Sequence, residues 1–291
     1  MKILQLTTIV LSTMFAVACN GDKTDSAAGE GEGEGEGEGE GEGEGEGEGE
    51  GEGEGEGEGE GEGEGEGEGT GALRLAHFGV FTGDMNTEVD IFVAGAASGI
   101  SLSFKDTTAF VDLPAGSYDF DIVPSGGTID DTVFSVTDFQ LSEGDMWSIY
   151  AAGYVSPADD TGNPFTVGAI AEDRTDIPDG NVRVQVTHAA AAGALTPVDV
   201  WVVDDACAPD TALLPGFNFG DTASVDLPTT EANLGFDVGG NGSVDACFKV
   251  PDVSVANDIV SVYAVNDDAG NVTLVAHLPD GSNAEILPSE F

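Results

Sequence analysis

Short apolar runs, rich in Val, Ile, Phe and Tyr and often alternating with polar residues, fill the chain after Gly71. Gly, Pro, Asp and Asn interrupt these runs about every 8 to 12 residues, and no stretch keeps a helical apolar period of 3.6 residues over three turns. This spacing is typical of β-sandwiches. In the first half of the chain it predicts strands over residues 73–78, 89–93, 109–113, 118–123, 133–141, 147–154 and 165–171.

The second half of the chain repeats the first in the same order. We therefore expect an all-β fold of two tandem immunoglobulin-like β-sandwich domains, at residues 72–175 and 181–291, each with about seven strands. The turn-forming segment Pro178-Asp179-Gly180 lies between them. The matching segments, at offsets of 111, 109, 114, 116 and 113, are residues 73–77 with 184–188, 89–93 with 198–202, 111–114 with 225–228, 118–122 with 234–238, and 148–151 with 261–264.

The amino terminus has the pattern of a secretory signal, because an apolar run over residues 3–17 follows a short positive start. The run is too short for a permanent membrane span. Small residues directly before Cys19 resemble the lipobox of bacterial lipoproteins, although Ala16 stands where that pattern usually has Leu. The resemblance implies a lipoprotein signal peptide at residues 1–18 and acylation of Cys19, which anchors the chain to a membrane. Ordinary secretion is the alternative.

The chain has three cysteines, an odd number that needs an explanation in an exported protein. Cys207 and Cys247 can pair with each other, because free thiols are disfavoured in an oxidising envelope. Cys19 is then the cysteine left for lipid. We therefore predict a disulfide between Cys207 and Cys247 within the second domain.

An acidic linker, residues 19–71, separates the signal peptide from the first predicted strand, and Gly and Glu alternate in it without a break over residues 29–69. Gly keeps its backbone freedom and the Glu residues repel one another, so we expect a disordered stalk. A sink for divalent cations and an acidic docking tail are the alternatives. Over the whole chain, 56 Asp and Glu against 7 Lys and Arg give a net charge of −49. This excludes a nucleic-acid partner, because a phosphate backbone needs a basic face.

The repeated segments carry a specific pattern: a strand ending in His188-Ala189, a Val-Asp-Val-aromatic-Val strand at residues 198–202, a Leu-Pro-Ala-Gly turn at residues 113–116 and a later aromatic-Ala strand. In these features the chain resembles domain of unknown function 4397, over nearly all of residues 72–278. The resemblance implies tandem β-sandwich modules in an exported bacterial lipoprotein. It implies no catalytic residue, because the family has no established activity.

The candidate chemistry of the chain lies in its three histidines. His77 and His188 hold equivalent places at the ends of the first strands of the two copies. Each is either a ligand or base paired with Asp90 or Asp199, or a packed side chain with one nitrogen bonded to a backbone carbonyl or a carboxylate. The chain has none of the common motifs of metal, phosphate or nucleophilic sites, so we favour packing. We expect His277 to be structural as well.

Four aspartates recur between the copies: Asp90, Asp112, Asp199 and Asp226. Each follows a Val in a predicted strand and should face solvent if the Val faces the core. There it can accept a hydrogen bond from a loop amide or pair with Arg74 or Arg183. Calcium binding by residues 237–245 or 204–210 is the alternative, although neither loop has the known twelve-residue spacing.

Together these observations predict a lipid-anchored protein of the bacterial cell envelope, at the outer membrane or cell surface, that displays two β-sandwich modules on an acidic stalk. We expect non-enzymatic surface recognition or adhesion, with a protein or polysaccharide partner at the sandwich loops and with no catalytic residue, metal or cofactor. A calcium-dependent binding or matrix protein is one alternative. The other is an envelope hydrolase with a site between the modules, which requires His77 or His188 to be exposed in a cleft beside a carboxylate.

Overall fold

The computed structural model describes residues 69–81, 87–155, 162–229, 232–251, 255–267 and 270–289. The predicted signal peptide, Cys19 and the part of the Gly–Glu tract before Gly69 lie outside these residues. In the portion of the chain that is described, no helix has the length and apolar character needed to cross a membrane.

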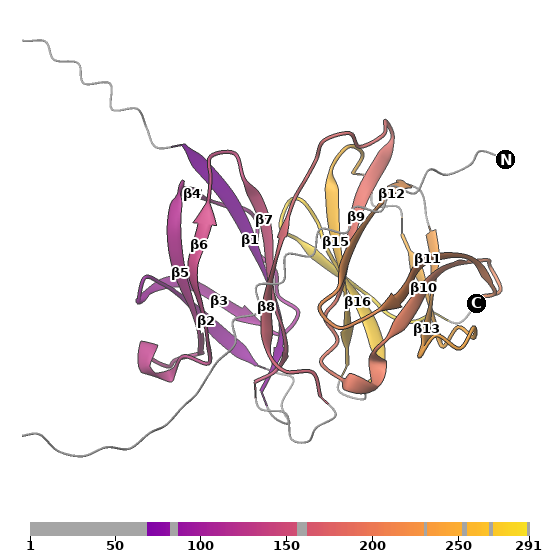
Figure 1. Ribbon diagram of the computed structural model, residues 1–291, viewed down its shortest axis with the longest axis horizontal. Helices are drawn as coiled ribbons and strands as arrows, with labels where there is room; N and C mark the ends of the chain where they lie inside the picture. Colours follow the sequence, from indigo (N-terminus) through magenta and orange to yellow (C-terminus); the bar gives the residue numbers. More distant parts are fainter. Residues whose placement is uncertain are drawn as a thin grey trace, which may run out of the picture. The chain divides into compact units, whose positions relative to one another are not determined.

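Eight strands from the first half of the chain form two four-stranded sheets, which we call the first sandwich (Figure 1). One sheet has the order β4-β1-β7-β8 and the other has the order β3-β2-β5-β6. The strands are β1 (Thr70–Val80), β2 (Glu88–Val93), β3 (Ala96–Ser103), β4 (Val111–Pro114), β5 (Gly116–Pro124), β6 (Phe134–Leu141), β7 (Met146–Tyr154) and β8 (Thr166–Ala171).

Nine strands from the second half form the second sandwich, with sheets of order β12-β9-β15-β16-β17 and β11-β10-β13-β14. Short 3-10 helices, Ile129–Asp131 and Gly193–Leu195, lie in the connections. The strands are β9 (Asn181–His188), β10 (Val198–Val203), β11 (Pro209–Phe217), β12 (Thr222–Pro228), β13 (Ala232–Val238), β14 (Ala246–Val250), β15 (Ile259–Asn266), β16 (Val272–His277) and β17 (Asn283–Ile286).

The all-β sandwich fold expected from the sequence is confirmed, and all seven predicted strands of the first half are present. The expected count of about seven strands per sandwich is wrong, because the structure has eight and nine. The strand missed in the first half is β3, whose sequence AASGISLS has too few apolar residues to alternate clearly. Every sheet draws its strands from one side of residues 172–180, and the domain boundary placed there stays a prediction.

The internal repeat extends to the strand register. In the first sandwich β1 pairs with β7 in parallel, and Arg74 lies opposite Ser148. In the second sandwich β9 pairs with β15 in parallel, and Gln185 lies opposite Ser261. Both pairs fall at matching positions of the sequence repeat, so the two halves share one strand arrangement at the centre of their inner sheets.

The central strands β1 and β15 are buried on both faces of their sheets. Alternate residues of β1, including Leu73 and Leu75, join the core of the first sandwich. The residues between them face the other way, where Ala76 and Phe78 pack in a cluster with Tyr263 of β15. The described residues of both sandwiches accordingly belong to one compact unit. This explains why β15 is buried along its whole length.

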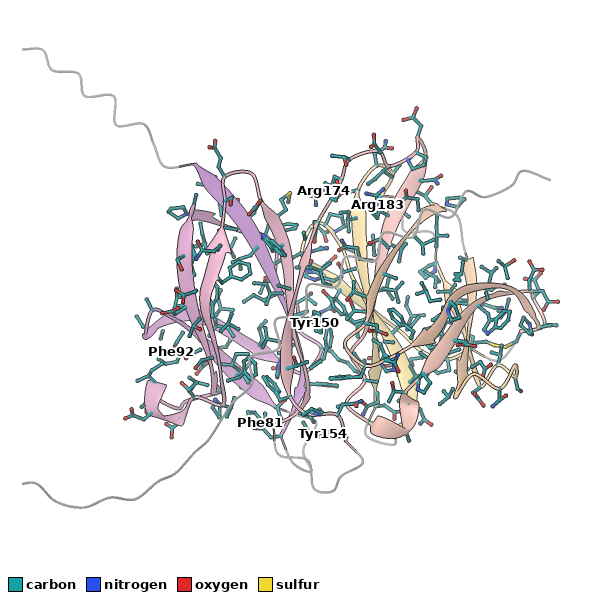
Figure 2. All side chains as sticks on the ribbon, in the orientation of Figure 1. Phe81, Phe92, Tyr150, Tyr154, Arg174 and Arg183 are labelled. Atoms are coloured by element: carbon teal, nitrogen blue, oxygen red, sulfur yellow. A yellow bond between two sulfur atoms is a disulfide. The ribbon has the colours of Figure 1, made fainter. Side chains whose placement is uncertain are left out.

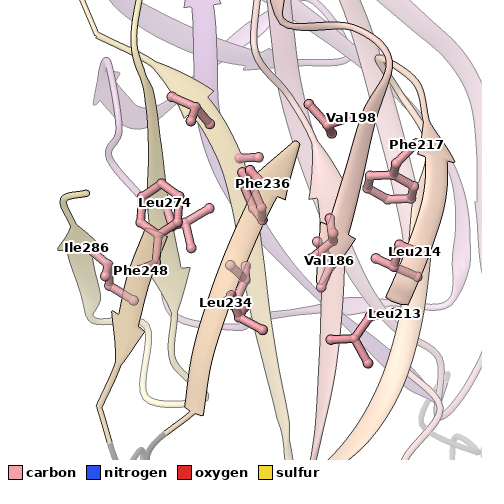
Figure 3. Close-up of a cluster of buried hydrophobic side chains, with 14 of the residues drawn as sticks. Val186, Val198, Leu213, Leu214, Phe217, Leu234, Phe236, Phe248, Leu274 and Ile286 are labelled. Atoms are coloured by element: carbon pink, nitrogen blue, oxygen red, sulfur yellow. The ribbon is translucent and has the colours of Figure 1, made fainter. Parts of the chain in front are cut away.

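The core of the second sandwich fills the space between its two sheets with aliphatic side chains and a few phenylalanines (Figure 3). Phe236 of β13 and Phe248 of β14 contact each other with ring centroids 5.1 Å apart. Across from them Val186 of β9 and Leu274 of β16 close the layer from the opposite sheet. Burial of such side chains stabilises a fold by about 1.5–3 kcal/mol each.

Candidate functional site

His77 lies on β1 with 1% of its surface exposed. Its Nε2 atom is 3.2 Å from Thr87 Oγ1, and that hydroxyl donates to the Gly79 carbonyl at 2.9 Å. Because the hydroxyl proton is already used, the Thr87 oxygen accepts from Nε2–H. Nδ1 then carries the lone pair, and it has no hydrogen-bond partner among the described residues. Burial lowers the pKa of His77 to about 4, against a smaller raising effect of Asp106.

His188 ends β9 and is also 1% exposed. Its Nε2 donates to the Leu195 carbonyl at 2.7 Å, and its Nδ1 accepts from the Ala190 amide at 3.4 Å. Burial lowers the pKa of His188, and the bond to Leu195 opposes part of that effect. The imidazole is therefore neutral, and both of its nitrogens form hydrogen bonds within its own sandwich.

The predicted packing of His77 and His188 is confirmed by their burial. The predicted partner is right for His188, which bonds to a carbonyl, and wrong for His77, which bonds to a hydroxyl. The hydroxyl takes this role because Thr87, directly before β2, bonds to both His77 and Gly79 of β1. Neither ring is exposed in a cleft beside a carboxylate, so the geometry required for a hydrolase is not met at these two residues.

His277 joins the two sandwiches. It ends β16, is fully buried, and donates from Nε2 to the carbonyl of Thr108 in the first sandwich at 2.8 Å. Burial, together with a smaller effect of the positive charge of Arg74, lowers the pKa of His277 to about 4. The ring is thus held neutral as a donor between sandwiches, which agrees with the structural role expected for it.

Arg74 of β1 is a fully buried arginine between the sandwiches. Its Nη2 forms an ion pair with Glu172 Oε1 at 2.6 Å, and neither side chain has any exposed surface. Glu172 directly follows β8, and its second oxygen binds Arg174 Nη2 at 3.2 Å. A buried ion pair is stable only when further hydrogen bonds satisfy both groups.

The other guanidinium protons of Arg74 supply these hydrogen bonds. Nε donates to Ser148 Oγ at 2.8 Å within the first sandwich, and Ser148 Oγ donates to Glu172 Oε1 at 2.5 Å. Toward the second sandwich, Arg74 donates to Ser261 Oγ and to the Leu278 carbonyl, both at 3.0 Å. One side chain therefore bonds to both halves of the chain.

Gln185 occupies the position of Arg74 in the second sandwich, as the shared strand register shows. Its Nε2 donates to the Ala171 carbonyl of the first sandwich at 3.1 Å, and its Oε1 lies 3.4 Å from Ser261 Oγ. Pairing with Arg74, one of the roles expected for the recurring strand aspartates, is wrong, because Arg74 pairs with Glu172. Glu172 lies in the connection between the sandwiches, outside the segments that repeat in the sequence.

Two tyrosines at equivalent positions, Tyr150 of β7 and Tyr263 of β15, meet with ring centroids 5.7 Å apart. Burial raises the pKa of Tyr263 to about 12, although the charge of Arg74 opposes the shift. Burial also raises the pKa of Tyr150, labelled in Figure 2, and its hydroxyl lies 3.3 Å from the Gly220 carbonyl. Both phenols stay protonated and act as packing groups between the sandwiches.

The connection between the sandwiches is held at its outer side by two partly exposed arginines (Figure 2). Arg174 donates from Nε to Asp258 at 2.7 Å. Arg183 donates two hydrogen bonds, of 2.8 and 3.0 Å, to the Asp226 carboxylate. It also donates to the carbonyls of Asp173 and Thr175. The expected pairing of Arg183 with a recurring aspartate is confirmed at Asp226.

The other recurring aspartates order loops. Asp90 accepts from the Ser101 hydroxyl and, at 2.9 Å, from the Gly126 amide, and these bonds lower its pKa. Asp199 accepts from the Gly216 amide, whereas Asp112 is exposed. The expected role of accepting a hydrogen bond from a loop amide is therefore confirmed for Asp90 and Asp199.

The two loops considered for calcium use their carboxylates to bind their own backbone. Asp237 accepts from the amides of Asn241 and Gly242 at 3.0 and 2.6 Å. Asp204 accepts from the amides of Ala206 and Ala208, both at 2.9 Å. Within the described ranges, no group of three or more His, Cys, Asp or Glu is placed to hold a metal ion.

Cys207 and Cys247 form a disulfide in the second sandwich, with Cα atoms 6.2 Å apart, a separation that a bridge can span. Cys247 lies on β14, and Cys207 lies in the loop between β10 and β11. The bridge therefore ties this loop to a strand at the other side of the same sheet.

Replacing both Cys207 and Cys247 with Ser should lower the melting temperature of the protein by several degrees, because the unfolded chain regains the entropy that the bridge removes. Thermal unfolding followed by circular dichroism measures the effect. Replacing Cys19, which lies outside the described residues, provides the matched control and should leave the melting temperature unchanged. Labelling of both Cys207 and Cys247 by a thiol reagent in the native exported protein would count against the bridge.

Residues 80–196 match the family described as Domain of unknown function (DUF4397), which supports the resemblance over that stretch. No curated protein matches the chain. One similar solved structure concerns alpha-glucan recognition by family 41 carbohydrate-binding modules from streptococcal virulence factors, with 13% identity, 69% of this chain and 96% of that chain covered, and a TM-score of 0.24. Another is a proposed adhesin from Bacteroides ovatus, with 8% identity, 74% and 95% coverage, and a TM-score of 0.20. Neither likeness is close enough to assign a function.

Proposed function

We propose that this chain is an exported, lipid-anchored envelope protein that recognises a protein or polysaccharide partner and catalyses no reaction. The observation that supports the proposal best is the buried Arg74–Glu172 pair with its bonds to both sandwiches. Domains joined by a linker move relative to each other unless their interface is large and well bonded. A fixed pair of sandwiches holds two sets of loops at a constant spacing, as a recognition surface requires.

The state of the histidines also favours recognition over hydrolysis. A general base must reach the proton that it removes and must titrate near the working pH. His77, His188 and His277 are each at most 1% exposed, and burial lowers the pKa of each. All three act as donors to fixed partners in the protein, and this suits a scaffold better than an active site.

The anchor and stalk would set where this surface lies. The 41 residues of the Gly–Glu tract would span ~35 Å as a flexible coil and ~135 Å when fully extended. Repulsion between the glutamates favours the longer end of that range at low salt. Such a stalk would hold the sandwiches away from the lipid headgroups, within reach of a partner at the cell surface.

We expect the mature protein to begin with a diacylated Cys19. Intact-mass measurement of the protein from membranes should show the added lipid, and Cys19→Ser should release an unmodified, water-soluble product. A wild-type protein that is secreted with an unmodified Cys19 would contradict lipid anchoring and leave ordinary secretion.

The recognition proposal is tested with the mature full-length protein on arrays of polysaccharides and envelope proteins, and in parallel on ester, peptide and glycoside substrates. We expect saturable binding to one class of partner and no turnover. His188→Gln keeps a donor for Leu195, and this variant should bind as the wild type does. Turnover that disappears in His188→Gln or in His77→Gln would replace the recognition proposal with the hydrolase.

A further inference from the structure

The first sandwich lacks one strand that the second sandwich has. In the second sandwich β17 pairs with β16 and ends the sheet, and it places Ile286 opposite Leu274 in the core. In the first sandwich the chain leaves β8 and continues through residues 172–180 to the second sandwich, so β8 ends its sheet (Figure 1). Among the described strands, none pairs with the outer edge of β8. The place that β17 holds in the second half is therefore held by no described strand in the first.

The side chains beside this place are buried in the second half and accessible in the first. The matching segments of β7 and β15, through their strand registers, make Ala169 equivalent to Ala276 and Val167 equivalent to Leu274. Ala276 is 4% exposed and Leu274 is 0% exposed, whereas Ala169 is exposed and Val167 is half-buried. Residues 156–161, which lie outside the described part, precede the opposite end of β8 from Ala169.

The backbone groups of β8 point into the same place. The Glu172 N–H, directly after β8, donates to the Met146 carbonyl of β7 at 2.8 Å. Hydrogen-bonded positions alternate along an antiparallel pair, so Val167 and Ala169 direct their N–H and C=O groups away from β7. Their equivalents on β16 lie opposite residues of β17. The first sandwich thus presents the backbone positions that hold β17 in the second.

Strand β8 has none of the features that keep other sheet edges from pairing with a further strand, which are charged residues, prolines and register shifts. Its sequence TVGAIA contains no charge and no proline, and its pairing with β7 is regular. Gln185 bonds to the Ala171 carbonyl, so the accessible part of the edge is Val167 and Ala169. At least one protective feature is present in each of the other seven edge strands of the described sheets, β3, β4, β6, β11, β12, β14 and β17.

The surface that an added strand would cover is apolar. Trp147 and Ile149 of β7 face the core of the first sandwich but remain half-buried. On the opposite sheet, Phe139 of β6 contacts Trp147 with ring centroids 5.7 Å apart. An aliphatic side chain placed over Val167 and Ile149 would therefore remove apolar surface from water, which favours binding.

We propose that the outer edge of β8 binds an extended segment of a partner protein, which adds a fifth strand antiparallel to β8. Backbone hydrogen bonds at Val167 and Ala169 would hold the segment. An aliphatic side chain opposite Val167 would pack as Ile286 does opposite Leu274. The net charge of −49 favours a segment with basic residues. This edge is separate from the loops proposed for recognition, so either proposal can fail while the other stands.

The test uses the full-length protein and the peptide KSNAKILK, which copies residues 282–287 with Lys in place of Glu285 and with one Lys added at each end. We expect isothermal titration to show saturable binding of one peptide per protein. Hydrogen exchange at the Val167 and Ala169 amides, followed by NMR, should become slower when the peptide is bound. The same peptide with Asp in place of Ile286 should bind at least about tenfold more weakly, because a charge would be buried.

Two variants block the edge. Ala169→Pro removes one outward N–H and leaves the bonds to β7 intact, whereas Ala169→Lys places a charge at the edge. Each should weaken binding of the peptide at least about tenfold. Melting curves establish that both variants fold, and Ala169→Lys serves if the proline variant does not. Ala97→Lys is the matched control, because it adds the same charge at an exposed alanine of another edge strand, β3; it should bind as the wild type does.

The proposal is overturned if the wild type does not bind the peptide, or if the folded Ala169→Lys variant binds as tightly as Ala97→Lys. Slow exchange of the Val167 and Ala169 amides without peptide, at every protein concentration, would show that this chain already covers the edge. Protection that grows with protein concentration would identify a second copy as the occupant. Either result would replace the partner segment.

Discussion

Replacing Arg74 with Met should lower the free energy of unfolding by about 3–5 kcal/mol, because it removes one member of a buried ion pair. Glu172 would keep its charge in a place without exposed surface, with only the partly exposed Arg174 as a counter-ion. Ser261 and the Leu278 carbonyl would also lose their donor. Urea denaturation monitored by circular dichroism measures the loss.

The matched control for this variant is Arg183→Met. Arg183 is also an arginine on the first strand of its sandwich, but its pair with Asp226 is partly exposed. Pairs of that kind contribute about 0–1 kcal/mol. A double variant, Arg74→Met with Glu172→Leu, should recover much of the stability lost in Arg74→Met, since no buried charge is left unpaired. Equal losses in Arg74→Met and Arg183→Met would show that the interface does not depend on the buried pair.

Acidification from pH 6.5 to 4 should destabilise the protein through its buried histidines. In the folded protein the pKa of His77 and of His277 is about 4, against 6.5 for a free histidine. Between these values the unfolded chain binds more protons than the folded one, so the free energy of unfolding falls as the pH falls. The loss amounts to about 3 kcal/mol for each of these two residues across the window, and His188 adds to it in the same direction.

His77→Gln and His277→Gln separate this effect from the titration of the many carboxylates. Gln keeps a donor for Thr87 or for the Thr108 carbonyl but does not titrate. Each variant should show a flatter dependence of unfolding free energy on pH between 4 and 6.5 than the wild type does. An unchanged slope in both variants would mean that these rings are not the groups that bind protons on unfolding.

Strand positions in this protein could be predicted from local pattern, whereas the contact between the sandwiches could not. The alternation in residues 89–93 and 118–123 marks strands with one buried face, and both strands are present. The nearly continuous apolar sequence of β15, interrupted by Ser261, does carry a signal, because a strand buried on both faces has this pattern. That signal identifies a second buried face but does not name the sheet that covers it.

The burial and the partner of Arg74 could not be predicted from the sequence. Between Leu73 and Leu75, a charged residue in a strand indicates a solvent-facing position, and here that face is covered by the other half of the chain. Its partner Glu172 follows β8 with no motif around it. The pairing of Cys207 with Cys247 follows from parity alone, since the chain has three cysteines, and it stays a prediction.

The matched register of Arg74–Ser148 and Gln185–Ser261 places equivalent positions of the two halves at the contact between the sandwiches. The charge at its centre is neutralised within the first half, because Arg74 pairs with Glu172 directly after β8. The second half meets this pair with neutral acceptors, the Ser261 hydroxyl and the Leu278 carbonyl. The contact therefore takes hydrogen-bond acceptors from the second half but no charge, and the first half would have to keep both members of the ion pair for the surface to stay neutral.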